Sequence, residues 1–111
     1  MNTPVRFTFP AAEHLKSRKD LEALFDQGRS ISAFPLRLLF LAADPARTIP
    51  IQIAFSAPKR KMKAAHDRNR MKRLMREAWR HHKHELVAYC REHNKTYNLL
   101  LISQCNTPAE Y

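Results

Sequence analysis

The most informative part of the chain lies at residues 67–80 and reads DRNRMKRLMREAWR. On an α-helix, where each residue advances by about 100°, this stretch has one apolar side and one cationic side. The apolar side carries Met71, Leu74, Met75, Ala78 and Trp79. The roughly opposite side carries Asn69, Lys72, Arg73, Arg76 and Arg80. The pattern predicts a long helix within residues 63–93 that packs on a core through one side and presents charge on the other.

The positive charge of the chain is concentrated around this helix. The 111 residues include 20 Lys and Arg against 10 Asp and Glu, which gives a net charge of +10. Residues 59–83 contain eleven basic residues and only Asp67 and Glu77 as acids, so this segment carries +9 of that charge. A solvated helix face usually interleaves Glu with Lys, and this one does not. The imbalance predicts a polyanionic partner, with nucleic acid first and an anionic membrane second.

A shorter helix is predicted near the N-terminus, at residues 17–27. Ser17 is a typical N-cap, Asp20 stands three residues later as in a capping box, and Leu21 and Leu24 follow at helical spacing. Gly28, the only glycine of the chain, occupies the position at which a left-handed residue ends many helices.

Strands are predicted both before and after the long helix in the sequence. Residues 36–42 form an apolar run, and residues 51–57 alternate in the manner of a half-buried strand. We expect these two to pair as a hairpin from 36 to 57, with a short strand at 31–34 before it. Residues 98–103 form another apolar run of strand length. Thr107 and Pro108 then resemble a helix start, but the chain ends at Tyr111.

Length and composition suit a single domain at residues 13–111, after a flexible N-terminal tail at residues 1–12. Residues 1–10 lack the apolar region of a signal peptide, and no apolar run reaches the roughly 18 residues that a membrane span needs. The two cysteines, Cys90 and Cys105, do not make a disulfide framework. We therefore expect a cytoplasmic protein with reduced thiols and no membrane partner.

The helix sequence resembles the RNR signature of the bacterial ribonuclease P protein family. The signature is Arg-Asn-Arg, an apolar residue, Lys-Arg, two residues, and then Arg with an acid or amide. It is matched here by Arg68, Asn69, Arg70, Lys72, Arg73, Arg76 and Glu77. The resemblance extends over residues 14–108 and includes Asp20-Leu21, Phe25 and Gly28 in the first helix, and Ser56, Lys59, Arg60 and Lys61 before the long one.

The resemblance implies a fold as well as a family. Such proteins are two-layer α/β sandwiches of order αβββαβα that resemble the second domain of ribosomal protein S5. They contain an unusual left-handed βαβ crossover. For this chain we expect the order αβββαβ, with the C-terminal helix missing.

The resemblance also implies a role as the protein subunit of ribonuclease P, an endonuclease that matures the 5′ end of tRNA. In such proteins the RNR helix docks on the ribonuclease P RNA, which carries the active site. We therefore expect no catalytic residue and no cofactor in this chain, and Mg²⁺ held mainly by the RNA. The residues expected to contact that RNA are Lys59, Arg60, Lys61, Lys63, Arg68, Asn69, Arg70, Lys72, Arg73, Arg76 and Arg80.

The second expected contact is with the 5′ leader of precursor tRNA, in a cleft between the sheet and the first helix. The residues assigned to this cleft are Phe25, Leu21, Arg37 and Leu39. Two departures from the family pattern bear on function. Leu21 stands where the family commonly has an aromatic ring, which weakens base stacking. The segment 61–65, before the long helix, lacks the glycine that is often found there.

Other interpretations compete with this one. A structural RNA-binding module, like a ribosomal protein, would share the basic helix without taking part in cleavage. A DNA-binding helix would need a dimerisation seam, and the heptads for one are absent, so no DNA partner is expected.

Individual side chains also have simpler explanations. His66, His81, His82 and His84 suggest zinc, but consecutive histidines on a helix point in different directions, so no metal site is expected. Cys90, Trp79 and Phe40 are expected in the core rather than in a site. For Phe25, core packing and the leader cleft are equally favoured by the sequence.

Overall fold

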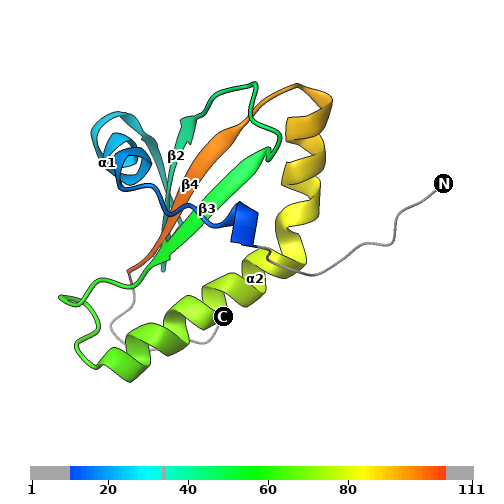
Figure 1. Cartoon of the computed structure of the whole chain (residues 1–111). Helices are drawn as coiled ribbons and strands as arrows, with labels where there is room; N and C mark the ends of the chain where they lie inside the picture. The colour runs from blue at the N-terminus through cyan, green and yellow to red at the C-terminus, as the bar shows by residue number, and fades with distance from the viewer. Residues whose placement is uncertain (1–10, 34, 105–111) are drawn as a thin grey trace.

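The computed structural model of the chain describes residues 11–33 and 35–104. They form a 3₁₀ turn η1 (Ala11–Glu13), followed by α1 (Arg18–Gln27), β1 (Arg29–Ala33), β2 (Leu36–Ala42), β3 (Ile51–Ser56), α2 (Ala65–Glu92) and β4 (Tyr97–Ser103) (Figure 1). The expected α/β fold and the order αβββαβ are confirmed. The short strand predicted at 31–34 begins earlier, at Arg29, and Phe34 lies outside the described residues.

The four strands form one mixed sheet in the order β1-β2-β4-β3. β1 pairs antiparallel with β2, β2 pairs antiparallel with β4, and β4 runs parallel to β3. The hairpin predicted from 36 to 57 is therefore wrong, because β4 lies between β2 and β3. The physical reason is burial: Leu99 and Leu100 of β4 point to opposite faces and are 3% and 4% exposed, which a central strand allows. The hairpin of this sheet is formed by β1 and β2.

Arg47 organises the connection that carries the chain from β2 to β3 past the start of β4. Its guanidinium donates to the carbonyl oxygens of Ile49 (2.7 Å) and Tyr97 (3.0 Å), and to the side-chain oxygens of Gln52 (3.1 Å) and Asn98 (2.7 Å). Burial lowers the pKa of this guanidinium, and the negative charges of Asp20 and Asp44 oppose that effect. One side chain thus joins the loop, β3 and β4.

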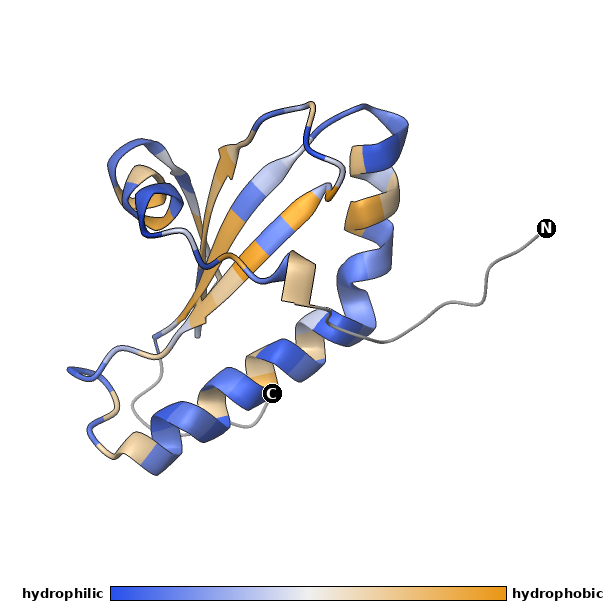
Figure 2. Cartoon of the chain, viewed as in Figure 1, coloured by the Kyte–Doolittle hydropathy of each residue, from blue (hydrophilic) through white to orange (hydrophobic). Residues whose placement is uncertain are grey.

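One helix covers each face of the sheet. On one face, Leu24 of α1 packs with Leu39 of β2 and Leu100 of β4. On the other face, the α2 residues Met71, Met75 and Cys90 pack with the strands and with the segment that precedes α2. The apolar strands therefore lie between α1 and α2 (Figures 1 and 2). The resemblance implied two layers, whereas the described residues form three.

The first helix begins as predicted and ends differently. The Ser17 hydroxyl accepts a hydrogen bond from the Asp20 backbone N–H at 3.3 Å. Gly28 caps the other end with φ −67° and ψ 149°, which is extended backbone and not the predicted left-handed conformation. The glycine is required for space: a Cβ built on Gly28 would lie 2.3 Å from the carbonyl oxygen of Leu24.

The residues of α2 that face the core recur every four positions, at Met71, Met75, Trp79, Lys83 and Val87. Four steps of about 100° overshoot a full turn by about 40°, so this stripe winds around the helix. Ala78, which was predicted on the apolar side, is exposed for that reason. Figure 2 shows how few apolar positions the N-terminal half of α2 has.

The segment before α1 lies along the outer edge of β3. His14 forms a parallel bridge with Ile53, and the backbone N–H of Leu15 donates to the Ile53 carbonyl at 2.9 Å. Ala11 and Ala12, which were predicted in a flexible tail, belong to η1 at the start of this segment. The rest of the predicted tail, residues 1–10, lies outside the described residues.

Some expectations about the fold stay predictions. The parallel β3–α2–β4 unit is present, but its left-handed sense and the likeness to ribosomal protein S5 are untested. The C-terminal helix expected to be missing after Thr107 falls outside the described residues. Among the helices of the described residues, none has the length and apolar character needed to cross a bilayer.

Candidate nucleic-acid interface

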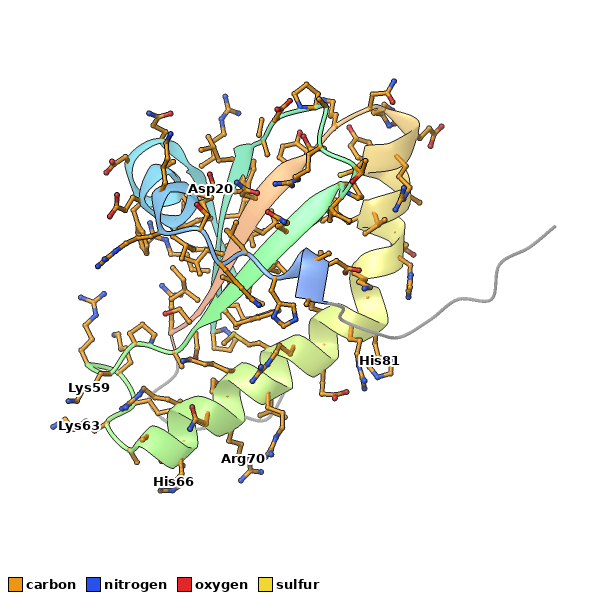
Figure 3. The ribbon with its side chains drawn as sticks, in the orientation of Figure 1. Asp20, Lys59, Lys63, His66, Arg70 and His81 are labelled. Atoms are coloured by element: carbon orange, nitrogen blue, oxygen red, sulfur yellow. The ribbon has the colours of Figure 1, made fainter. Side chains whose placement is uncertain are left out.

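A cationic surface extends over the loop before α2 and the N-terminal half of that helix. Figure 3 shows Lys59, Lys63 and Arg70 projecting away from the sheet. The predicted contact residues that are exposed on this surface are Lys59, Arg60, Lys61, Lys63, Asn69, Arg70, Arg73 and Arg76. Lys72 and Arg68 are half-buried at its edge. The structure therefore brings the predicted set together on one loop and one helix.

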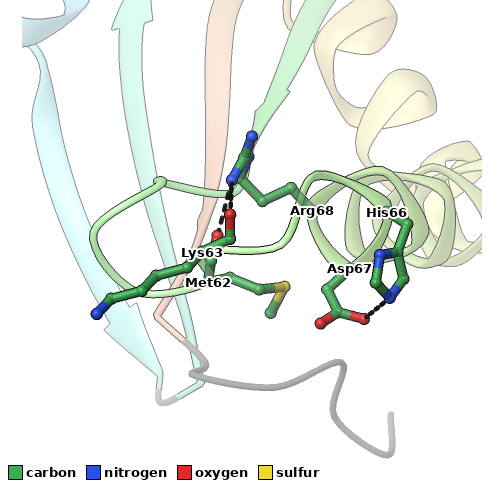
Figure 4. Close-up of polar contacts among 5 residues, drawn as sticks. All are labelled: Met62, Lys63, His66, Asp67 and Arg68. Atoms are coloured by element: carbon green, nitrogen blue, oxygen red, sulfur yellow. Dashed lines mark hydrogen bonds and ion pairs between the residues drawn. The ribbon is translucent and has the colours of Figure 1, made fainter.

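Arg68 holds the basic loop, residues 59–63, against α2. Its Nη1 donates to the carbonyl oxygens of Met62 at 3.0 Å and Lys63 at 2.7 Å (Figure 4). Met62 is itself 2% exposed and packs beneath the loop with Met71 and Met75. Part of the hydrogen-bonding capacity of Arg68, predicted to face RNA, is thus directed to the loop.

Two further cations of the helix are engaged within the protein. Arg80 is half-buried and its Nη2 lies 2.6 Å from Oε2 of Glu77, which makes it a weaker candidate for an external partner. Lys83 is 5% exposed, and its Nζ lies 2.6 Å from Oε1 of Glu13 in η1. Lys83, the last basic residue of the segment 59–83, is therefore directed into the protein.

The four residues assigned to a leader cleft separate into two pairs. Phe25 is 66% exposed on α1, so it is not a core residue. Arg37 is exposed on β2, where its Nε donates to Oγ of Ser30 at 2.9 Å. Leu39 points to the same face of the sheet, but it is 4% exposed beneath α1. Leu21 is half-buried against the same cluster. Leu39 therefore presents little surface to an external partner, because α1 covers it, and its assignment to the cleft stays a prediction.

The core predictions for Cys90, Trp79 and Phe40 are confirmed. Cys90 is fully buried, and Trp79 and Phe40 are partly buried against the same cluster. Burial raises the pKa of the Cys90 thiol, with an opposing effect from the positive charge of Lys95. Cys105 lies outside the described residues. Within the described ranges, no three His, Cys, Asp or Glu side chains are grouped as metal ligands would be.

One basic residue near the helix was missed by the sequence reasoning. Lys16 lines an open groove of about 190 Å³ with Lys72 and Arg76 of α2, along the outer edge of β3. Lys16 lies far from the RNR stretch in the sequence, and no periodicity connects the two. The bond from Leu15 to Ile53 holds this segment on β3, and the ion pair between Glu13 and Lys83 holds it beside α2.

Comparison with known proteins gives the family of the chain. The sequence model of the family described as Ribonuclease P matches residues 9–106. The chain belongs to the ribonuclease P protein family. A relative from Porphyromonas gingivalis, named Ribonuclease P protein component, is 33% identical over 86 residues, which are 78% of this chain and 63% of the relative. A relative of the same name from Chlorobaculum tepidum is 38% identical over 81 residues, or 70% of this chain and 53% of that protein.

These ribonuclease P relatives are longer than the part matched here, since the chain spans less than two thirds of their length. Among solved structures, the Staphylococcus aureus RNase P protein matches with a TM-score of 0.65 and 18% identity. That match covers 83% of this chain and 75% of the other. At this identity the structural match supports the fold alone.

Proposed function

We propose that this chain is the protein subunit of a ribonuclease P and binds the catalytic RNA through its cationic loop and α2. The observation that supports this most is the exposed surface formed by residues 59–63 and the N-terminal half of α2. Arginine forms bidentate contacts with phosphate oxygens, which suits a folded RNA. Asp67 and Glu77 are the only acids within residues 59–83, and Glu77 is engaged by Arg80.

The second part of the proposal concerns the 5′ leader of precursor tRNA. Phe25 offers an exposed ring on α1, and Arg37 offers a guanidinium on the sheet face that α1 covers. Stacking of a base on an aromatic ring contributes about 1–3 kcal/mol. With the protein already bound to the catalytic RNA, this contact becomes intramolecular and raises substrate affinity through effective concentration.

The proposed reaction is hydrolysis of one phosphodiester of precursor tRNA, which leaves a mature 5′ end. Mg²⁺ held by RNA phosphates would activate the water and stabilise the leaving oxygen. The residues of this chain reduce the repulsion between two polyanions and orient the leader. None of them is assigned a catalytic role.

The proposal is tested by reconstitution with a bacterial ribonuclease P RNA at low Mg²⁺, using precursor tRNA with and without its leader. The wild-type chain should rescue cleavage and favour the substrate with a leader. Arg70→Ala with Arg73→Ala should weaken RNA binding, whereas Arg91→Ala with Lys95→Ala removes equal charge at the far end of α2 and should not.

The leader contact is tested separately with Phe25→Ala. Because Phe25 is 66% exposed, this variant should fold and assemble normally while losing about fivefold or more in preference for the leader. RNA binding without any effect of the leader on affinity or cleavage would instead identify a structural RNA-binding module.

A further inference from the structure

The groove beside Lys16 brings cations from two separate parts of the chain to one place. Its walls are residues 14–16 on one side and Lys72 and Arg76 of α2 on the other. Its floor is the edge of β3, at residues 53–55. Of the described residues that line the groove, three carry a full positive charge and none is acidic. Such an arrangement is electrostatically unfavourable unless an anion occupies it.

The wall that carries Lys16 is held in place by the fold. Leu15, adjacent to it, is 5% exposed and its backbone N–H donates to Ile53 at 2.9 Å. On the other side of His14, Glu13 forms the 2.6 Å ion pair with the nearly buried Lys83. This pair ties the N-terminal segment directly to α2. The backbone of Lys16 is therefore fixed relative to the helix, even though its side chain is exposed.

The groove is suited to a phosphate group rather than to an apolar ligand. Lys16 and Arg76 are exposed and Lys72 is half-buried, so their charged ends are available from solvent. The apolar side chains of Ala54 and Phe55 at the floor lower the local dielectric, which strengthens attraction to an anion. A single α-helix presents its cations along one line. This groove adds a cation, Lys16, on the wall opposite Lys72 and Arg76.

We propose that this groove binds a phosphodiester of RNA, with Lys16 as a contact residue outside the RNR helix. The proposal rests on the proposed function and extends it. Lys16 immediately precedes Ser17, the N-cap of α1. The groove therefore lies between the cationic surface of α2 and the start of the helix that carries Phe25. The phosphate belongs either to the catalytic RNA or to the leader of precursor tRNA.

The test compares Lys16→Gln with Lys95→Gln, an exposed lysine on the turn after α2 that loses the same charge. Thermal melting checks that both variants fold. Affinity for ribonuclease P RNA alone is measured across a salt series, and affinity of the holoenzyme for precursor tRNA is measured with and without the leader. Lys16→Gln should weaken one of these affinities about three- to fivefold and make its log-log salt slope shallower by about one.

The two arms identify the source of the phosphate. A loss in binding to the RNA alone assigns it to the catalytic RNA, and a loss only with the leader present assigns it to the leader. Adding Arg76→Gln to Lys16→Gln should cost less than the sum of the separate effects, because both side chains contact the same group. In one outcome, Lys16→Gln and Lys95→Gln have the same affinities and salt slopes in every arm, while Arg70→Ala with Arg73→Ala still weakens binding. That result would contradict the phosphate site in the groove and leave the proposed function standing. If the wild-type chain itself fails to bind the RNA, both are overturned.

Discussion

At the scale of the residue, Gly28 illustrates a requirement for space rather than for an unusual backbone angle. Its φ of −67° is open to any residue, yet a Cβ would meet the Leu24 carbonyl oxygen at 2.3 Å. The same carbonyl accepts the backbone N–H of Gly28 at 3.0 Å, so the close approach is part of the helix end. Leu24 is fully buried between α1 and the sheet, and its backbone cannot shift without disturbing that packing.

We therefore expect Gly28→Ala to lower the free energy of unfolding by about 1–3 kcal/mol, as forced overpacking usually does. Urea denaturation followed by circular dichroism measures this loss. Gln27→Ala, at the adjacent exposed position, is the control and should change stability by about 0.5 kcal/mol or less. Equal stability of Gly28→Ala and the wild type would contradict the steric explanation.

Cys90 gives a prediction of pH dependence. Burial raises the pKa of its thiol, so the folded chain holds this proton more tightly than the unfolded chain does. The resulting stability is fully present below the unfolded thiol pKa of about 8.5 and is lost as the pH rises through the folded pKa. The free energy of unfolding should therefore fall more steeply above about pH 8.5 in the wild type than in Cys90→Ala.

The comparison uses denaturation curves between about pH 7 and pH 10 under reducing conditions. Cys105 is present in both proteins, so its titration cancels. Cys90→Ala should be less stable at every pH because it leaves a cavity, and only the difference in slope tests the thiol. Parallel pH profiles would show that Cys90 does not contribute to the dependence.

At the scale of the element, Arg68 links the basic loop to the first turns of α2. The N-cap of α2 is Ala64, which has no side-chain oxygen to satisfy the first backbone N–H groups. Before it, the loop turns at Pro58, whose carbonyl oxygen accepts the N–H groups of Lys61 and Met62 at 3.1 Å each. The guanidinium of Arg68 adds bonds to the Met62 and Lys63 carbonyls and so fixes where the loop presents its cations.

Arg68→Ala should loosen this loop without unfolding the domain. We expect the backbone amides of Lys61 and Met62 to exchange hydrogen roughly fivefold faster, since about 1 kcal/mol of local stabilisation is lost. Arg70→Ala removes the same charge at an exposed position of the same helix and is the matched control. Hydrogen exchange that is unchanged in Arg68→Ala, or changed equally in Arg70→Ala, would refute the positioning role.

The elements also show what the sequence can predict. Ser17, the apolar run at 36–42 and the alternation at 51–57 depend on neighbours in the chain, so the bounds of α1, β2 and β3 were predicted closely. Strand pairing depends on distant contacts. The placement of β4 between β2 and β3 is supported by Arg47, whose partners Tyr97 and Asn98 lie about 50 positions away. No local pattern contains that information.

The same distinction applies to the candidate site. The residues of the α2 surface follow one another along a single helix, so periodicity found them. The burial of Leu39 was not predicted, because strand alternation gives the face of the sheet but not what covers that face. Lys16 was missed because its position beside α2 depends on the contacts of Leu15 and Glu13 with distant residues.

At the scale of the whole molecule, charge is distributed unevenly and not merely in excess. The net charge is +10, and nearly all of it lies in residues 59–83. The described acids Asp20, Glu22 and Asp26 lie on α1, and Glu85 and Glu92 lie in the C-terminal half of α2. If binding to RNA depended on net charge alone, moving a charge from one end of α2 to the other would have no effect.

A variant that exchanges Arg73→Glu with Glu85→Arg keeps the net charge at +10 and tests that point. Neutralisation of about five phosphates predicts a log-log salt slope of roughly −3 to −5 for the wild type. The exchange should make the slope shallower by about one or two and weaken RNA affinity at low salt, since it removes one cation and adds a repelling acid. The control exchanges Glu92→Lys with Lys95→Glu, both exposed and beyond the cationic surface, and should bind as the wild type does. Identical slopes in the two exchanges would mean that overall charge, and not the arrangement of cations on α2, attracts the RNA.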